Sequence, residues 1–513
     1  MKKILLLSIA LSALTVSCRE EFLESAPTET IADAPAQTKL NGLYVMMINT
    51  GTGGTSLDHD DFGQKGYDIY SDMLSQDMAL EATSYGWYVA MANMTAQTDF
   101  TNTMNYKPWR YYYRMIAGAN QIIDALGGTT AVPTTDADKY AMGQAKALRA
   151  YAYFYLMQFY TKGYSASEAA IPVYTKAGMP AQPKSTQAQV YALIVDDLTK
   201  SVNYLEGFAR TNKGMIDQSV AKGLLAYTYA AMDQPAQAAA LSKEIINDYG
   251  YTSTSKTETV RMAHSAGSTV VSGGGFNDLK TPSWMWGFDI AVVNGLDLVS
   301  WWGQVDMFTY SYASVGTRKG IDLGLYGTMK GRDIRKNQFV MSTINDSEGT
   351  PIATTPARNF PGNKFFDLNR IAQGQRQVTA DYIFMRVDEF YFLAAESLAK
   401  TGQDAEAKAI LKQVLYNRYS DAPGSTTEPV TAAAYVDSFL DPLTGTGLQA
   451  EIYNQTRLEF WGEGKSYLAF KRNKATVTRG SNHLFFVGTA FPYNDARVSL
   501  TIPQEEIVNN PHF

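Results

Sequence analysis

Six aromatic residues lie in segments rich in glycine and polar side chains, where a binding surface would need them. They are Tyr85, Trp87, Trp301, Trp302, Tyr310 and Tyr312. Sugar rings have apolar C–H faces that stack on tryptophan and tyrosine, and their hydroxyl groups require polar partners nearby. Successive side chains of an extended segment point in opposite directions, so we expect either Trp301 or Trp302 to stay free for a ligand. These residues predict a carbohydrate-binding surface, with burial in the core as the alternative for each of them.

Catalytic chemistry finds little support in the residue pattern. The four histidines are His59, His264, His483 and His512, and no two of them share one face of a helix. Zinc-protease, nucleophile-elbow, phosphate-loop and dinucleotide motifs are absent, so we predict no catalytic residues and no cofactor. The segment Asp58-His59-Asp60-Asp61 lacks calcium-loop spacing, and we predict a solvated loop without a metal there. A carboxylate pair can assemble across a fold, which leaves a secreted glycoside hydrolase as an alternative.

The composition is that of a large, acidic, globular protein. The 513 residues include 45% hydrophobic positions, enough to bury a substantial core and too many for a chain disordered throughout. Lysine and arginine total 44 against 50 aspartates and glutamates, and the net charge of −6 argues against a nucleic-acid partner. The single cysteine, Cys18, excludes an intramolecular disulfide and a cysteine metal cage.

The N-terminus has the layout of a lipoprotein signal peptide. Residues 1–17 combine a positively charged start with an apolar stretch that is too short to span a bilayer. The residues that end at Cys18 resemble a lipobox, which predicts cleavage before this cysteine and attachment of lipid to it. Residues 18–37 are then the lipid anchor and linker. Within them, Arg19-Glu20-Glu21 resembles the export signal of lipoproteins displayed on the cell exterior.

Much of the chain shows the spacing of apolar side chains that is typical of helices. The clearest stretch is 140–160, where apolar residues recur every three or four positions. Further helices are predicted at 109–126, 186–205, 219–232, 235–248, 382–400, 404–419 and 448–461. The stretches 219–248 and 387–417 predict helical hairpins of about the tetratricopeptide repeat length, although an ordinary antiparallel hairpin fits equally well.

Residues 250–374 break this helical pattern. They hold 16 of the 40 glycines and four of the seven tryptophans, and we predict short strands at 284–290 and 335–341 among long loops. Long loops on a rigid scaffold commonly carry binding residues. The sequence therefore predicts a mainly α protein with a tetratricopeptide-like helical repeat scaffold and a loop-rich insertion that contains short β-strands. The scaffold is expected at 38–249 and 381–473, the insertion at about 250–380 and a C-terminal tail at 474–513.

Several segments spread along the chain resemble the SusD/RagB family of surface-exposed nutrient-binding lipoproteins. Residues 18–24 are similar to the mature start of the family, and Trp109–Asn120 to one of its helices. Residues 143–154 resemble the pattern A-E-A-K-x-L-R-A-x-x-Y-F, with Gln144 in place of the usual acid. The C-terminal half resembles the family at Arg386, Glu389, Glu396, Arg457, Glu459, Glu463, Gly464 and the ending 502–511.

The resemblance implies a single SusD-like domain over 38–513 with four tetratricopeptide-like units and a loop-rich binding face. It also implies a non-catalytic protein, lipid-anchored in the outer membrane and facing the cell exterior. Such a protein delivers an oligosaccharide to a TonB-dependent, SusC-like transporter. Peptide binders also occur in the family, so a peptide is the alternative ligand. The resemblance transfers no binding residue, and the six aromatic residues remain predictions from their chemistry.

Overall fold

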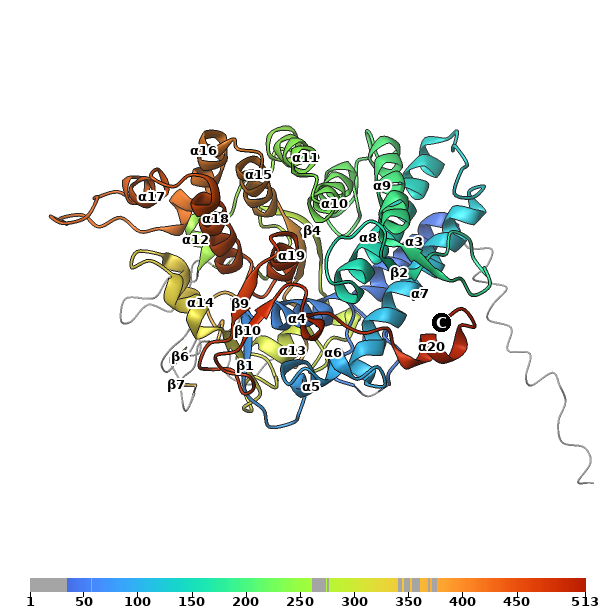
Figure 1. Cartoon of the computed structure of the whole chain (residues 1–513), viewed down its shortest axis with the longest axis horizontal. Coiled ribbons are helices and arrows are strands. Elements are labelled where there is room, and N and C mark those ends of the chain that lie inside the picture. Colours follow the sequence, from blue (N-terminus) through green and yellow to red (C-terminus); the bar gives the residue numbers. More distant parts are fainter. Residues whose placement is uncertain are drawn as a thin grey trace, which may run out of the picture.

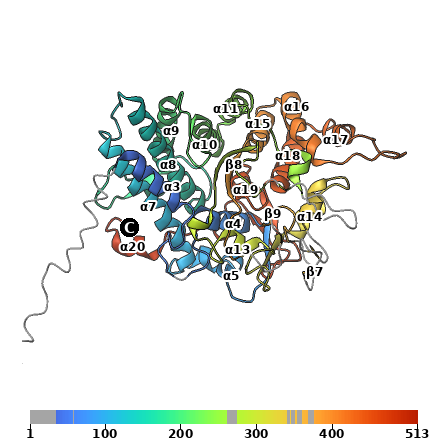
Figure 2. The ribbon, with the colours of Figure 1, turned by 180° about the vertical axis from the view of Figure 1, so that it is seen from behind.

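The computed structural model describes residues 35–56, 58–260, 274, 276–339, 344–345, 351–352, 360–367, 370 and 376–513. Helices stand in a row along one face of the molecule, and short strands and loops gather on the opposite face (Figures 1 and 2). The helices before the insertion are α3 (Ala36–Met46), α4 (Gln64–Leu74), α5 (Val89–Ala92), α6 (Thr95–Thr98), α7 (Thr103–Ala125), α8 (Asp136–Tyr160), α9 (Gln187–Tyr204), α10 (Gln218–Ala231) and α11 (Pro235–Asp248). The later helices are α12 (Lys256–Thr259), α13 (Trp301–Val305), α14 (Leu323–Thr328), α15 (Asp388–Lys400), α16 (Asp404–Leu415), α17 (Ala432–Leu440), α18 (Gly445–Glu459), α19 (Lys465–Arg472) and α20 (Gln504–Asn509).

Helix α8 is the central helix of the N-terminal half. Thr135 caps its first turn by accepting a hydrogen bond from the Asp138 backbone N–H at 3.2 Å. Asp136 and Asp138 add negative charge where the helix dipole favours it. All residues from 141 to 160 are buried, because α7 and α9 pack against this helix. A helix buried on all sides needs apolar or aromatic residues on every face, which explains its many tyrosines as core residues.

Two pairs of helices continue the row. The hairpin α10–α11 packs against the hairpin α15–α16 through contacts between α11 and α15. Gly402, in the turn between α15 and α16, has a φ of +77°, a backbone conformation that favours glycine. The predicted mainly helical fold with helical hairpins is confirmed. The helix predicted at 382–400 is wrong at its start, because Tyr382–Arg386 forms a strand and α15 begins at Asp388.

The strands form separate two-stranded antiparallel sheets. They are β1 (Met78–Ala82) with β5 (Arg318–Ile321), β2 (Ala169–Pro172) with β3 (Lys184–Thr186), β4 (Trp284–Phe288) with β8 (Tyr382–Arg386), β6 (Ile344–Asn345) with β7 (Pro351–Ile352), and β9 (Thr476–Thr478) with β10 (Ala490–Pro492). The strand predicted at 284–290 is present as β4. Its pairing with β8 joins the insertion to the strand that follows it directly.

Short 3-10 helices complete the described structure at η3 (Val292–Asn294), η4 (Ile334–Gln338), η5 (Tyr416–Arg418) and η6 (Ala496–Val498). Helix η4 replaces the strand predicted at 335–341, so that prediction is wrong for the residues described. Asp333 explains the difference, because its carboxylate accepts a hydrogen bond from the Arg335 backbone N–H at 3.0 Å and pairs with the Arg335 guanidinium at 2.7 Å. The aspartate thereby caps a helical turn at this point.

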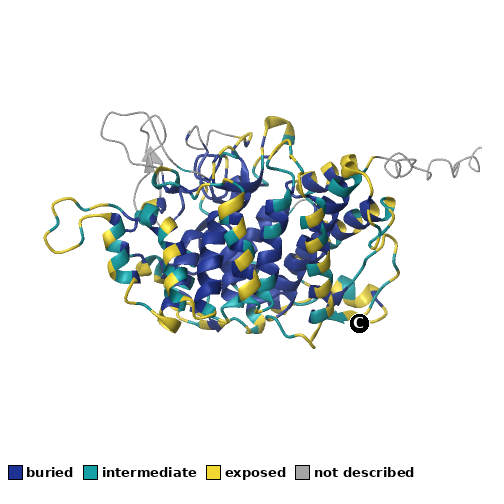
Figure 3. Ribbon diagram, turned by 90° about the horizontal axis from the view of Figure 1, so that it is seen from above, coloured by how far each residue is buried: buried dark blue, intermediate teal, exposed yellow. Residues whose placement is uncertain are grey.

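A large hydrophobic core runs through the described chain from Leu40 to Leu500. Figure 3 shows the buried residues in the middle of the helix row. The C-terminal tail closes this core: the Leu500 N–H donates to the Phe159 carbonyl at 2.7 Å, and the Leu484 N–H donates to the Leu80 carbonyl at 3.1 Å. Among the described residues, no helix combines the length and apolar character needed to cross a membrane.

Candidate functional site

Three loop segments bring four aromatic side chains together. His59 lies between α3 and α4, Tyr85 and Trp87 follow β1, and Tyr312 lies between α13 and β5. The His59 and Trp87 rings are stacked, with centroids 5.1 Å apart and an interplanar angle of 5°. The Tyr312 ring centroid is 5.3 Å from that of Tyr85 and 6.2 Å from that of Trp87, both in edge-on geometry. We call His59, Tyr85, Trp87 and Tyr312 the aromatic platform.

The members of the platform differ in their exposure to solvent. Tyr85 exposes 61% of its surface, Trp87 is half-buried, and Tyr312 exposes only 6%. The Tyr312 hydroxyl is hydrogen-bonded to Nδ1 of His59. Tyr85 and Trp87 are therefore rings that a ligand can reach, the buried Tyr312 packs against both, and the half-buried His59 covers one face of Trp87 by stacking.

Tyr310 extends the aromatic surface two residues before Tyr312. It is 37% exposed, and the guanidinium carbon of Arg376 lies 4.2 Å from the centroid of its ring. This geometry is a cation–π contact. The guanidinium covers one face of the partly exposed Tyr310 ring and adds hydrogen-bond donors, of the kind that sugar hydroxyl groups require, next to it.

Hydrogen bonds tie the loops of the platform to one another. The Ser84 backbone N–H donates to Oγ1 of Thr317 at 3.0 Å, which joins the loop after β1 to the start of β5. The Gln304 side-chain amide donates to the His59 carbonyl at 2.8 Å, and Nζ of Lys319 donates to Oε1 of Gln304 at 2.8 Å. These contacts keep the platform rings in place without a ligand, which lowers the entropy cost of binding.

Trp301 and Trp302 do not belong to the exposed surface. The expectation that one of them stays free is wrong, because residues 301–305 form helix α13 rather than an extended segment. Ser300 caps this helix by accepting a hydrogen bond from the Gly303 N–H at 3.0 Å. Both indole rings are only 1% exposed, and Trp301 packs against Phe365 with ring centroids 5.3 Å apart. Both tryptophans are core residues beneath the platform region.

The acidic residues beside His59 fasten the loop instead of facing solvent. Lys107 pairs with Asp58 at 2.7 Å and with Asp60 at 2.6 Å, and the Asp61 carboxylate accepts a hydrogen bond from the Gly53 N–H at 2.8 Å. Asp60 and Asp61 are fully buried, so the prediction of a solvated loop is wrong for them. Burial raises the pKa of Asp61, and its hydrogen bonds oppose that shift. Within the described residues, no group of acidic, histidine or cysteine side chains has a geometry suited to a metal ion.

Sequence reasoning placed His59 only among potential metal ligands and missed its stacking on Trp87. The two residues belong to different loops, and no local spacing reveals that the loops meet. Arg376 was missed for the same reason. Cys18, the predicted lipid attachment site, lies outside the described residues.

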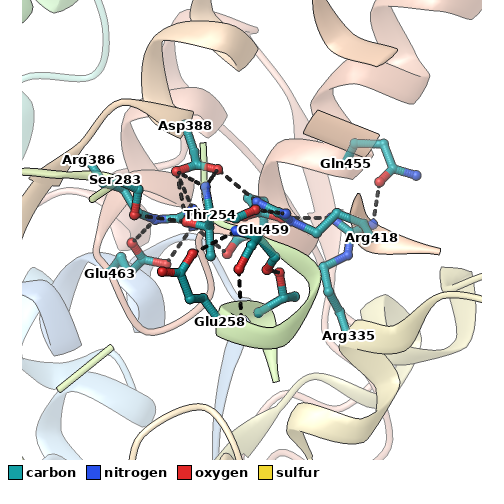
Figure 4. Close-up of polar contacts among 12 residues, drawn as sticks. Thr254, Glu258, Ser283, Arg335, Arg386, Asp388, Arg418, Gln455, Glu459 and Glu463 are labelled. Carbon is teal, nitrogen blue, oxygen red and sulfur yellow. Dashed lines mark hydrogen bonds and ion pairs between the residues drawn. The ribbon is translucent and has the colours of Figure 1, made fainter. Parts of the chain in front are cut away.

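A buried ionic cluster lies where α12, β8, α15 and α18 meet (Figure 4). Its charged members are Arg335, Arg386, Asp388, Arg418, Glu459 and Glu463. Glu459 is the central acceptor and receives hydrogen bonds from Arg386 and Arg418 at 2.9 Å and from Arg335 at 3.2 Å. Desolvation opposes its ionisation, but the adjacent Arg418 and Arg386 hold the pKa of Glu459 well below its usual range.

The ionic cluster joins the loop-rich insertion to the helices. The Thr254 hydroxyl donates to Asp388 at 2.9 Å, and Arg418 donates to the Thr254 carbonyl at 2.7 Å. Lys364, from the insertion, donates to Glu463 at 2.8 Å. The charged side chains of the cluster are at most 3% exposed and satisfy one another, so the cluster positions the insertion and is not a surface for a ligand.

Two family models match the chain on either side of residues 250–311. A SusD-like model described as starch-binding and associating with the outer membrane matches residues 21–249, and the SusD family model matches residues 312–512. A curated relative, a SusD-like protein from Bacteroides ovatus, is 24% identical over 235 residues. That match covers 45% of this chain and 40% of the relative's length. The chain belongs to the SusD/RagB family.

Solved structures share the fold over nearly the whole chain. A SusD-like carbohydrate binding protein from Bacteroides vulgatus has a TM-score of 0.71 and 21% identity, and the match covers 93% of this chain and 96% of that one. A SusD superfamily protein from Bacteroides fragilis has a TM-score of 0.68 and 21% identity, with 96% and 99% covered. Surface glycan-binding protein A from Bacteroides thetaiotaomicron, solved with laminarihexaose, has a TM-score of 0.63 and 16% identity, with 93% and 97% covered.

Proposed function

We propose that this protein is a non-catalytic, lipid-anchored carbohydrate-binding protein of the outer membrane. It captures oligosaccharides on the aromatic platform at the cell surface and delivers them to a TonB-dependent, SusC-like transporter. The proposal rests mainly on one observation. The Tyr85 and Trp87 rings are accessible to a ligand, and contacts with His59 and Tyr312 hold them in place. Membership of the SusD/RagB family and the laminarihexaose complex of one structural neighbour support it.

The platform has the chemistry that a sugar ring needs. A pyranose laid on Tyr85 and Trp87 buries its C–H face against the rings, and its hydroxyl groups remain at the edge of the platform. Ser84 is an exposed polar residue of the loop after β1, and Arg376 is an exposed residue that contacts Tyr310 from another loop; both can meet those hydroxyl groups. Because the rings are pre-oriented, binding energy is not spent on ordering them.

The acidic residues next to His59 favour binding without hydrolysis, because they are engaged in contacts within the protein. A glycoside hydrolase needs two carboxyl groups on either side of the scissile bond, one of them able to donate a proton. Asp58 and Asp60 are paired with Lys107, and Asp61 is occupied by the backbone N–H groups of Gly53 and Thr55. These acids act within the protein, which supports a binding role for the platform.

Calorimetry with a panel of oligosaccharides tests the platform. The protein comprising residues 19–513 should bind a member of the panel, and Trp87→Ala or Tyr85→Ala should each weaken binding about tenfold, the loss of about 1.4 kcal/mol of stacking. Tyr435→Ala, a half-buried tyrosine on α17, is the matched control and should leave the affinity unchanged. Unchanged affinity in both platform variants would refute the site. Binding to peptides alone would transfer the proposal to a peptide ligand, and release of shortened sugars would establish a hydrolase.

Membrane fractionation tests the anchor and the partner separately. Cys18→Ala should move the protein from the membrane to the soluble fraction, because the anchor is the acyl chains. The unaltered protein, solubilised in mild detergent, should co-purify with a TonB-dependent transporter. Continued membrane association of the Cys18 variant would contradict the anchor, and isolation without a transporter would contradict delivery.

A further inference from the structure

A concave surface lies along helix α7, and none of the residues that line it belongs to the aromatic platform. It is a groove of about 480 Å³ between α7, residues 174–179 and helix α20. Figures 1 and 2 both place α20 beside α7 at one end of the helix row. Its volume falls within the range of small-molecule sites, roughly 300–1,000 Å³. We call this surface the α7–α20 groove.

Aromatic rings form part of the walls of the α7–α20 groove. Tyr106, Tyr113 and Tyr174 line it and are half-buried, so part of each ring is open to solvent. The Tyr113 hydroxyl donates to the Pro172 carbonyl at 2.8 Å, and the ring centroids of Tyr113 and Tyr174 are 5.8 Å apart in edge-on geometry. The ring orientations are therefore set by the protein itself.

Polar groups of both charge signs surround these rings. Arg110 and Lys176 are exposed cations at the rim, and Glu505 is a half-buried acid on α20. Within the described residues, the Lys176 ammonium and the Glu505 carboxylate make no hydrogen bond or ion pair, and Arg110 has only a 3.4 Å contact with the Tyr106 hydroxyl. The groove thus offers free donors and a free acceptor around aromatic faces.

Helix α20 is held firmly as the second wall of the groove. Nε1 of Trp109 donates to Glu506 at 3.3 Å, and the Gln504 N–H donates to the Phe100 carbonyl at 2.9 Å. The Asn510 side-chain amide donates to the Gln182 carbonyl at 2.9 Å. These contacts attach the helix to α7 and to the segment before β3, so the groove is present before a ligand arrives.

The lining favours a carbohydrate over a peptide. Extended peptides are commonly bound by pairing with a free sheet edge, and helical peptides by a continuous apolar groove. The walls of the α7–α20 groove are helix and loop, and β2 ends at Pro172, before the lining segment begins at Tyr174. Tyrosine faces interspersed with arginine, lysine and glutamate instead suit a sugar, whose hydroxyl groups both donate and accept hydrogen bonds.

One loop separates the groove from the aromatic platform. Arg114 of the groove donates to the Thr52 carbonyl at 2.9 Å, and His59 of the same loop stacks on Trp87 of the platform. We propose that the α7–α20 groove is a second carbohydrate-binding site, which holds a neutral oligosaccharide segment independently of the platform. The carbohydrate class of this ligand rests on the proposed function, whereas the groove itself does not depend on the platform residues.

The test measures binding at each site with the other removed. The probes are laminarihexaose and the tightest ligand from the oligosaccharide panel, added to the protein comprising residues 19–513. The platform variant is Tyr85→Ala with Trp87→Ala, and the groove variant is Tyr174→Ala with Glu505→Gln. The matched control, Tyr435→Ala with Glu428→Gln, makes the same two changes near α17. Calorimetry gives the affinities, and hydrogen exchange of the amides at 174–179 and 504–510 reports on the groove.

We expect the platform variant to retain weaker binding that protects the amides at 174–179 and 504–510 from exchange. Adding the groove substitutions to it should weaken the remaining affinity at least about fivefold, and adding the control pair should not. Absence of protection at these segments with either probe, or equal affinity with the groove and control pairs, would overturn the second site. If the groove substitutions weaken binding and the platform substitutions do not, the platform is refuted as a binding site and the groove is supported. If only the platform substitutions weaken binding, the groove is refuted as a binding site and the proposed function is unaffected.

Discussion

Replacement of Glu459 by glutamine tests whether the buried ionic cluster stabilises the fold. Glutamine keeps the shape of the side chain, but it offers one acceptor oxygen and turns an NH₂ group toward guanidinium donors. Arg386 and Arg418 then lose negative charge at hydrogen-bond distances of 2.9 Å in a site without water access. Removing one partner of a buried pair typically costs about 3–5 kcal/mol. We expect a loss of this size in the free energy of unfolding.

Thermal and urea unfolding at pH 7 measure this loss. A chain of this length has an unfolding entropy of about 1 kcal/mol per kelvin, so the Tm should fall by about 3–5 °C. Glu406→Gln is the control, because Glu406 forms a surface pair with Lys243 at 2.9 Å in which both side chains are substantially exposed. That substitution should cost at most about 1 kcal/mol.

The difference between wild type and Glu459→Gln should depend on pH in a defined direction. Since the pKa of Glu459 is held well below its ordinary value of 4.5 in the folded protein, its stabilisation is complete above about pH 4.5. It is lost as the pH falls toward the folded pKa, and the two proteins should become more alike there. Equal stability of the variant and wild type at pH 7, or a gap that widens in acid, would refute the reasoning.

Three further changes test other parts of the structure. Burial lowers the pKa of Lys319 to about 7 in the folded protein. Unfolding therefore takes up a proton between about pH 7 and 10, and the free energy of unfolding should rise with pH in this range. Lys319→Met should reduce that slope by about 1.4 kcal/mol per pH unit, as measured by denaturant titrations at several pH values. Trp301→Ala should lower the free energy of unfolding by about 3–5 kcal/mol and leave the carbohydrate affinity of the folded protein unchanged. A loss of affinity measured by calorimetry would instead assign Trp301 to the binding site. Tyr312→Phe removes the hydrogen bond to His59 and should weaken sugar binding about threefold by calorimetry with little change in Tm, and full affinity would show that the bond does not orient the platform.

The helical part of the fold could be predicted because burial leaves a local pattern. The helix predicted at 235–248 matches α11, and the stretch 140–160 lies within α8. The error at 382–386 has a physical origin: β8 is buried at every position, and a short apolar run looks alike in a buried strand and a buried helix. Its pairing with β4 decides between the two, and that partner is distant in sequence.

The candidate site could be predicted only residue by residue. The side-chain chemistry of Tyr85 and Trp87 predicts a binding role, and the structure places both beside Tyr312. The same chemistry predicts a binding role for Trp301, but this residue is buried, because the cap at Ser300 makes its segment helical. Sequence chemistry identifies side chains that could bind a sugar, but which of them reach the surface depends on contacts between loops.

The pairing of β1 with β5 affects the order in which parts of the molecule can fold. Helices α7 to α10 mainly contact near neighbours in sequence and can form early, whereas the platform needs Tyr312 and a strand that ends at Ile321. A chain ending at residue 249 lacks the partner of β1 and leaves the edge of that strand open to association with other chains. Ligand recognition is therefore among the last properties that this chain acquires as it folds. Proteolytic cleavage at one position between Trp87 and Tyr312, followed by release of the C-terminal fragment, should therefore abolish ligand binding while the early helices remain folded.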